Sequence, residues 1–159
     1  MDLTIQVEDY KLNIRAAGII IHNGKFLVHR NVNSDHYALI GGRVAIGEDS
    51  ATTVIREIKE EMGKDAEIIG YVSTIENFFE MKGSKYHEIM FVHRVEFTDE
   101  EDRKIEYTLK NIEGREELQY EWIDIDKVDE YNVVPKEIKG ILKDGNWPVH
   151  KINDELKKN

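Results

Sequence analysis

The sequence predicts a mixed α+β fold in which strands outnumber helices. Three observations lead to this class. Apolar, β-branched runs recur along the chain, glycine-containing turn signals join several of them in pairs, and strong helix signals occur in only two places. Because short turns between such runs are typical of antiparallel hairpins, we expect hairpins to dominate the sheet.

The first expected hairpin lies near the amino terminus. The run "AAGIIIH" ends at His22, the run "KFLVHR" begins at Lys25, and Asn23 and Gly24 lie between them. Asn-Gly between two apolar runs is a strong hairpin signal. The sequence therefore predicts two antiparallel strands here.

Three further strands are expected downstream. "AEIIGYVSTIENFFE" and "KYHEIMFVHRVEF" flank the turn signal "MKGS", and "LQYEWIDI" follows later. The highly charged segment from Thr98 to Glu117 separates the hairpin from the last of these strands, and we expect a surface connection there. The closing stretch "INDELKKN" is expected to form a frayed terminal helix.

The two helix signals differ in strength. The first helix should cover residues 51–62, because Asp49 or Ser50 is a suitable N-cap and Gly63 is suited to end a helix. The second helix should lie in "PKEIKGILKDG", with Pro135 in its first turn, where proline is favourable.

Composition limits the possible functions. At 159 residues the chain is expected to form one domain over residues 1–159. The absence of cysteine excludes disulfides, thiolate metal sites and cysteine nucleophiles. The net charge of −10 argues against binding to duplex nucleic acid, and no apolar run approaches the ~20 residues of a membrane span. We therefore expect a cytoplasmic protein whose phosphorylated ligands would need local basic groups or bound cations.

The first helix combines two unlike faces. At about 100° per residue, its apolar residues form one stripe, and Glu57, Glu60 and Glu61 form an adjacent stripe; the apolar set is Ala51, Val54, Ile55, Ile58 and Met62. Like charges at this spacing repel, and Arg56 alone cannot neutralise three carboxylates, whereas a hard divalent cation can. A solvated acidic face is the alternative that the helix alone leaves open.

The residues before this helix favour a ligand site over a merely solvated face. Gly41 and Gly42 would allow the backbone to turn sharply and to approach a ligand, and Glu48 adds a carboxylate shortly before the helix. Together they predict a metal and phosphate site.

This segment resembles the signature of the Nudix hydrolases. That signature is a glycine, five residues, a glutamate, seven residues, and then Arg-Glu-apolar-x-Glu-Glu-x-Gly-apolar. Every glycine and charged position is filled within 23 residues, by Gly42, Glu48, Arg56, Glu57, Ile58, Glu60, Glu61 and Gly63. Two positions depart from the usual pattern: Lys64 replaces an apolar residue, and Ile40 stands where the family frequently has proline.

The resemblance implies a Nudix fold, an α/β/α sandwich around a mixed, largely antiparallel β-sheet. It also implies an enzyme that uses Mg²⁺ or Mn²⁺ and an attacking water to cleave a diphosphate linkage in a nucleoside diphosphate derivative. Glu57, Glu60 and Glu61 match the family's metal ligands, Arg56 would brace them, and Glu48 would bind the metal or hold one of its waters. The residues that indicate the substrate in other Nudix subfamilies are missing from this chain. A MutT-like (d)NTP or nucleotide pyrophosphohydrolase is therefore expected by default.

The general base could be one of the glutamates of the signature or a residue further along the chain, and the sequence does not decide between them. Glu88 lies inside an apolar strand, where a carboxylate should face a cleft, which makes it a better candidate than His87 on the opposite face. For the substrate, Arg43 is the expected phosphate donor, with Arg15 and Arg30 as alternatives. The other expected substrate contacts are Gly41, Gly42 and Tyr37, with one of Phe78 and Phe79 as a possible base-stacking ring.

Two other functions compete with hydrolysis. A Nudix-like sensor that binds a nucleotide without cleaving it would typically lose glutamates of the signature, and this chain keeps them. An isopentenyl diphosphate isomerase on the same scaffold would need cysteine, which this chain lacks. The expected partner is a small nucleotide, and exposed edge strands would permit a homodimer.

Overall fold

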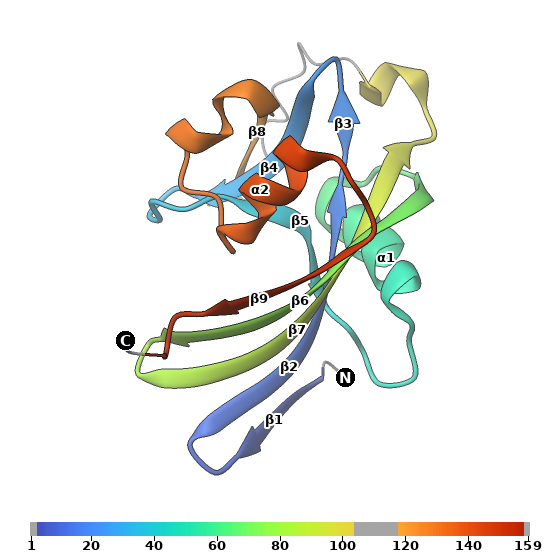
Figure 1. Cartoon of the computed structure of the whole chain (residues 1–159). Coiled ribbons are helices and arrows are strands. Elements are labelled where there is room, and N and C mark those ends of the chain that lie inside the picture. The colour runs from blue at the N-terminus through green and yellow to red at the C-terminus, as the bar shows by residue number, and fades with distance from the viewer. Residues whose placement is uncertain (1–2, 104–117, 158–159) are drawn as a thin grey trace.

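The structure, a computed structural model, describes residues 3–103 and 118–157 and is built around one mixed nine-stranded sheet (Figure 1). The strands run in the order β3-β4-β5-β2-β7-β6-β9, with β1 paired to β2 and β8 paired to β4. Their bounds are β1 (Thr4–Val7), β2 (Tyr10–Ile19), β3 (Ile21–His22), β4 (Lys25–Asn31), β5 (Ala38–Arg43), β6 (Ala66–Met81), β7 (Ser84–Phe97), β8 (Leu118–Asp124) and β9 (Val149–Asp154).

Most strand pairs are antiparallel, but β2 pairs with β7 and β6 pairs with β9 in parallel. The helices are α1 (Ser50–Met62) and α2 (Glu137–Asp144), and two short 3₁₀ helices are η1 (Glu100–Arg103) and η2 (Ile125–Glu130). The predicted α+β class with a mixed, largely antiparallel sheet is confirmed.

The two helices pack on opposite faces of the sheet. Successive residues of a strand point to opposite faces, and β2 shows this with two adjacent alanines. Ala16 belongs to the core cluster that contains Val54 and Ile58 of α1, whereas Ala17 belongs to the cluster that contains Ile138 of α2. The sheet therefore lies between two helical layers, as the resemblance implies.

Both predicted hairpins are present, and their turns show why. Asn23 and Gly24 have φ values of 50° and 75°, and Lys82 and Gly83 have 51° and 79°. Two successive residues with positive φ form the turn whose twist matches paired strands. In the first hairpin β3 pairs with β4, and in the second β6 pairs with β7.

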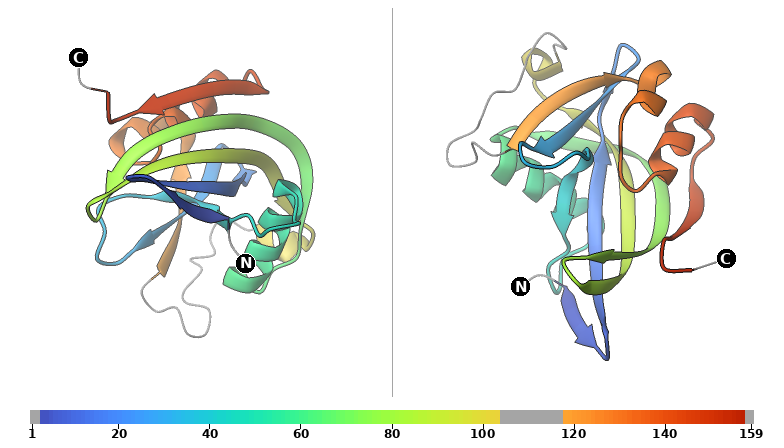
Figure 2. Two further views of the ribbon diagram at one scale, coloured as in Figure 1. Left: turned by 90° about the horizontal axis from the view of Figure 1, so that it is seen from below. Right: turned by 90° about the vertical axis from the view of Figure 1, so that its left-hand side faces the viewer.

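The carboxyl-terminal part departs from the sequence prediction. The expected terminal helix is wrong, because Ile152–Asp154 belong to β9, which pairs in parallel with β6 (Figure 2). An available strand edge supplies backbone partners that outweigh a weak local preference. The second helix begins at Glu137 after the N-cap Lys136, so Pro135 precedes it and does not lie in its first turn.

Two other stretches complete the comparison with the expected elements. β1 was not predicted from the sequence. The expected surface connection forms η1 at its start, and its residues 104–117 lie outside the described residues. Within the described ranges, no helix is both long and apolar enough to cross a membrane.

Candidate active site

The acidic helix α1 is positioned by caps that its own sequence supplies. The Asp49 carboxylate accepts a hydrogen bond from the Thr52 backbone N–H at 2.8 Å, and Gly63 ends the helix in the left-handed conformation with φ 67°. Val54, Ile58 and Met62 are buried against the sheet, whereas Ala51 and Ile55 are only half-buried. The helix begins at Ser50, one residue before the predicted start, and ends at Met62 as predicted, with Asp49 as its N-cap.

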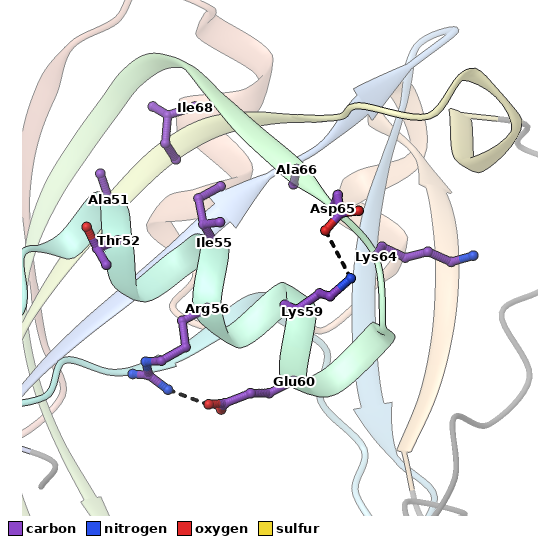
Figure 3. Close-up of a pocket in the computed structure, with 10 residues that line it drawn as sticks. All are labelled: Ala51, Thr52, Ile55, Arg56, Lys59, Glu60, Lys64, Asp65, Ala66 and Ile68. Carbon is purple, nitrogen blue, oxygen red and sulfur yellow. Dashed lines mark hydrogen bonds and ion pairs between the residues drawn. The ribbon is translucent and has the colours of Figure 1, made fainter.

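Arg56 is the centre of an ion-pair network that joins three glutamates. Its Nε and Nη2 atoms each donate to one carboxylate oxygen of Glu48, both at 2.9 Å. Its Nη1 atom donates to Glu57 at 2.9 Å and to Glu60 at 3.1 Å, and Figure 3 shows the contact with Glu60. Charge-assisted bonds of this two-pronged kind fix orientation as well as contributing energy. Arg56 thus orients the carboxylates around it.

The same contacts shift the protonation of both main partners. Hydrogen bonds from Arg56, and then one from Thr53, lower the pKa of Glu48 to about 2. The pKa of Arg56 is raised, and the main cause is its hydrogen bonding to Glu48. Both groups therefore stay charged over the whole range in which the protein would work.

The three helix glutamates differ in environment. Glu60 is largely exposed, with 56% of its side chain accessible, whereas Glu57 retains 15% and Glu61 only 6%. The Glu61 carboxylate lies 3.9 Å from Nδ1 of His29 on β4. Two of the three carboxylates are therefore turned into the protein, which a simple solvated helix face would not require.

The paired glycines act by close packing and not by forming a turn. Gly41 and Gly42 lie inside β5, opposite Ala17 and Ala16 of β2, and neither has a positive φ. A side chain at residue 42 would overlap the Glu57 carboxylate, and one at residue 41 would overlap the Ala16 backbone carbonyl. The expectation of a sharp turn here is wrong, and what the glycines allow is close packing of β5 against Glu57 and Ala16.

The carboxylates have the chemistry of divalent-cation ligands but are not gathered into a metal site. In the described part of the chain, no three acidic or histidine side chains gather closely enough to hold a metal ion, and Arg56 bonds to both Glu57 and Glu60. Their oxygens are the hard donors that Mg²⁺ and Mn²⁺ prefer, and the space beside Gly42 holds Glu57 against the backbone. Glu57, Glu60 and Glu61 therefore have the donor chemistry for such a cation, and Nη1 of Arg56 would have to release Glu57 and Glu60 before these two could bind it. Direct binding by Glu48 would also require breaking its two bonds to Arg56.

A groove with an apolar wall runs along the outer side of this helix (Figure 3). It has a volume of about 710 Å³, and Ala51 and Ile55 face it from α1 while Ala66 and Ile68 face it from β6. Glu57 and Glu61 are not part of its lining. Of the three glutamates on α1, only Glu60 lines this groove, together with Arg56.

A second cavity, of about 400 Å³, opens on the other face of the sheet, and we call it the cleft. It contains four of the residues proposed from the sequence: Arg15, Arg43, Phe79 and Glu88. Arg15 and Arg43 are direct neighbours on the paired strands β2 and β5. Gly42 touches Glu57 on the face that α1 covers, and the next residue lines the cleft on the other face, so the end of β5 lies between the cleft and the carboxylate cluster, by which we mean Glu57, Glu60 and Glu61.

Other expected substrate residues do not line the cleft. The ring of Tyr37 packs against Tyr131 at 5.6 Å, and the guanidinium of Arg30 lies over it, also at 5.6 Å. Burial raises the pKa of Tyr37. His87 contacts Phe78, with ring centroids 4.4 Å apart, on the opposite face of the hairpin. Alternation along the strands thus separates His87 from Glu88, and Phe78 from Phe79, as predicted.

A family model described as the NUDIX domain matches residues 12–143, which is most of the chain. The chain belongs to the Nudix family. A search of curated proteins gives no significant match. The family assignment and the prediction of a Nudix hydrolase as the class of enzyme are confirmed.

Solved structures share this Nudix fold at low sequence identity. A NUDIX hydrolase from Nitrosomonas europaea is 13% identical, with a TM-score of 0.64 over 90% of this chain and 79% of that one. A UDP-X diphosphatase is 18% identical, with a TM-score of 0.61 over 87% of this chain and 66% of that one. An ADP-ribose pyrophosphatase from Streptococcus suis 89-1591 is 16% identical, with a TM-score of 0.56 over 89% of this chain and 98% of that one.

Sequence reasoning missed part of the cleft of this Nudix protein. Asn13, Asn77, Tyr86 and Asn153 all line it, together with Glu88. The available signal was the same one that singled out Glu88, a polar side chain within an apolar strand. It was weaker for the asparagines, because an uncharged amide in a strand is less costly to bury than a carboxylate.

Proposed function

We propose that this protein is a Nudix pyrophosphohydrolase that uses Mg²⁺ or Mn²⁺ to cleave a diphosphate linkage in a nucleotide, of the MutT-like kind that acts on (d)NTPs. The observation that carries the proposal is the junction at the end of β5. There Gly42 touches Glu57 of the carboxylate cluster on one face of the sheet, and Arg43, the next residue, lines the cleft on the other. Printed names of the structural neighbours, a UDP-X diphosphatase and an ADP-ribose pyrophosphatase, also describe reactions at diphosphate linkages.

Glu57, Glu60 and Glu61 would hold the cation. When bound, such a cation neutralises phosphate oxygens and lowers the pKa of bound water. Glu48 holds Arg56 by two bonds, and Arg56 holds Glu57 and Glu60. Arg56 and Glu48 thus act as positioning residues. The carboxylates stay aligned before the cation binds, so less conformational freedom is lost on binding.

Arg43 and Arg15 would bind the substrate phosphates from the cleft. Their neighbouring positions on β5 and β2 place two positive charges side by side in the cleft. Arginine presents a planar set of donors that suits phosphate oxygens. The two arginines would thereby offset the protein's net charge of −10 for an anionic ligand. Gly41 and Gly42 contribute by letting β5 pack closely, and Glu88 remains our candidate for accepting a proton from the attacking water.

The decisive experiment is hydrolysis of a nucleotide panel with Mg²⁺ or Mn²⁺. The panel contains the (d)NTPs, oxidised dGTP, ADP-ribose, sugar nucleotides and dinucleoside polyphosphates. Wild type is compared with Glu60→Gln, which removes one carboxylate charge from the cluster. The exposed Glu67 on β6 supplies a matched control, Glu67→Gln. Cleavage of any member that is lost in the first variant and retained in the second supports the proposal.

The opposite result has a defined meaning. If no panel member is cleaved with either metal but a nucleotide binds tightly in calorimetry, the protein is a Nudix-like sensor. The pairing of Arg56 with Glu57 and Glu60 is the observation that favours this second candidate function. A guanidinium bound to these carboxylates competes with a metal cation for them.

A further inference from the structure

Helix α1 covers only one end of its face of the sheet. The long strands β2, β6 and β7 continue past this helix, and β1 and β9 flank them (Figures 1 and 2). Six apolar side chains lie on the part beyond α1, which we call the open face: Ile5 on β1, Leu12 on β2, Phe78 on β6, Ile89 and Phe91 on β7, and Ile152 on β9. The open face is thus assembled from five strands.

The strand register places the first row of these residues on one side of the sheet. Ile5 lies directly opposite Leu12 on the paired strands β1 and β2. His87 of β7 lies opposite Leu12 on one side and opposite Phe78 on the other. Directly opposite residues of neighbouring strands project from the same face, and the His87 and Phe78 rings have centroids 4.4 Å apart. The row therefore runs without a break across four strands.

A second row lies two residues further along the strands. Ile89 lies opposite Ile14 of β2 and Glu76 of β6. Glu76 in turn lies opposite Ile152 of β9. Phe91 occupies the next row, again two residues on along β7. At about 4.8 Å between strands and about 7 Å between rows, the open face measures roughly 19 by 14 Å. With the side chains at its margin it reaches the size of the apolar patches that mark interaction sites.

Burial alternates along these strands and leaves the open face uncovered. Residues that point to the cleft side, such as Glu88 and Asn153, are buried, whereas Ile152 is 59% exposed and Ile5 is 51% exposed. The other four members are half-buried. In the part of the chain that the structure describes, none of the six belongs to either core cluster or packs against one. Folding of one copy therefore leaves this apolar surface in water, where its burial would be favourable.

The carboxylates that lie within these rows are already engaged. Glu76 is hydrogen-bonded to the His150 imidazole at 2.8 Å, and Asp154 accepts backbone hydrogen bonds from Leu156 and Lys157. Neither lysine nor arginine occupies a position in the described rows. An anionic partner, such as nucleic acid or an anionic membrane, therefore finds no cation here. A second copy of this chain, with its net charge of −10, meets the least repulsion at this surface.

A second copy also has the right shape. Two β-sheets pack face to face about 10 Å apart with their strands within about 30° of each other, because both twist in the same sense. Two copies of one sheet have the same twist, and a two-fold axis brings the same patch of each copy together. We propose that this protein forms a homodimer in which the open faces of two copies pack against each other. Because the cleft lies on the other side of the sheet, the inference does not depend on the proposed function.

The size of the open face predicts a dimer that dissociates on dilution. A standard interface buries about 800 Å² of each partner, and the open face alone provides less. Sedimentation equilibrium over a hundredfold range of protein concentration measures the association. It should show monomer at the lowest concentration and dimer at the highest.

Charge substitutions at the two edges of the open face test where the copies meet. Ile152→Glu should weaken the dimer about tenfold or more, because it places an unpaired carboxylate in an apolar interface. Ile5→Glu makes the same change at the opposite edge and should act in the same direction. Ile69 of β6 is 47% exposed and lies outside the open face, so Ile69→Glu is the matched control and should dimerise like wild type. Circular dichroism melting shows whether each variant is folded, and Ile5→Glu serves if Ile152→Glu is not.

Three results would overturn the inference. The first is a wild-type protein that stays monomeric at every concentration. The second is a dimer that both Ile5→Glu and Ile152→Glu leave intact, because it would use another surface. The third comes from flotation with phosphatidylcholine vesicles. If a monomeric wild-type protein binds them and Ile152→Glu abolishes the binding, the open face contacts a lipid surface and not a second copy.

Discussion

Arg56 binds both carboxylate oxygens of Glu48, through its Nε and Nη2 atoms at 2.9 Å each. The two residues lie eight positions apart, so the bond ties the loop before α1 to the middle of that helix. A third contact, from Nη2 to the Arg43 carbonyl at 3.4 Å, extends the tie to β5. Glu48 thereby fixes the arginine that orients Glu57 and Glu60.

Glu48→Gln should destabilise the fold. The variant replaces a charge-assisted pair of bonds by a neutral side chain that can accept only one of them. We expect a loss of about 1–3 kcal/mol in the free energy of unfolding, because Arg56 is left with an unmatched, partly buried charge. Urea denaturation measures this, with Glu67→Gln as the control for charge alone. Equal midpoints for the two variants would show that the Glu48 pair contributes nothing to stability.

Divalent cations should raise the thermal stability of the wild-type protein. A cation that binds only the folded state stabilises it by about 2.7 kcal/mol at a concentration one hundred times its Kd. Glu57→Gln should remove most of this gain, because Glu57 is the carboxylate held against β5. Thermal unfolding with increasing MgCl₂ or MnCl₂ measures the effect. A Tm that rises equally in wild type and variant would place the cation elsewhere.

Gly42→Ala and Gly41→Ala should have different consequences. A methyl group at residue 42 meets the end of the Glu57 side chain, which can move, so activity should fall while the protein still folds. A methyl group at residue 41 meets the backbone of Ala16, which cannot move without breaking the pairing of β5 with β2, so stability should fall. Circular dichroism melting together with hydrolysis rates separates the two. The reverse ranking of the melting temperatures would contradict this account of the strand.

Local signals explain which elements the sequence predicted. Helix α1 carries its own caps, Asp49 and Gly63, and the first hairpin carries its own turn residues, so no distant contact was needed to find them. The parallel pairs of β2 with β7 and of β6 with β9 are different, because their partners are far apart in sequence. Hydrophobic pattern specifies a face but not a neighbour.

The same distinction divides the candidate site. The carboxylate cluster comes from one helix and the residues just before it, so spacing alone brought Glu48, Arg56 and Glu57 together. The cleft is assembled from several strands, and Asn13 and Asn153 come to line it together only through the strand register. The spacing of residues along the chain does not predict which residues of distant strands are paired. Glu88 was found because a carboxylate in an apolar strand stands out by its cost of burial.

The stability of the protein should fall as the pH drops below about 6.5, and His93 should account for part of the loss. Its Nε2 atom is hydrogen-bonded to the Ser50 hydroxyl at 2.8 Å at the first residue of α1, and the residue is 8% exposed. Burial lowers the pKa of His93, although the Asp49 carboxylate opposes the shift. The helix amino terminus disfavours a positive charge in the same way.

The sign of the pH effect follows from this lowered pKa. An ordinary histidine in the unfolded chain titrates near 6.5, so between that pH and the folded pKa the unfolded state binds more protons and gains stability as pH falls. The contribution of His93 is therefore complete above about pH 6.5 and is lost below it. His93→Gln can keep a hydrogen bond to Ser50 but cannot titrate, so its unfolding free energy should change less between pH 7 and pH 5. His22, whose pKa burial also lowers, is present in both proteins and cancels in the comparison. Parallel stability curves for the two proteins over this range would exclude His93 as the group responsible.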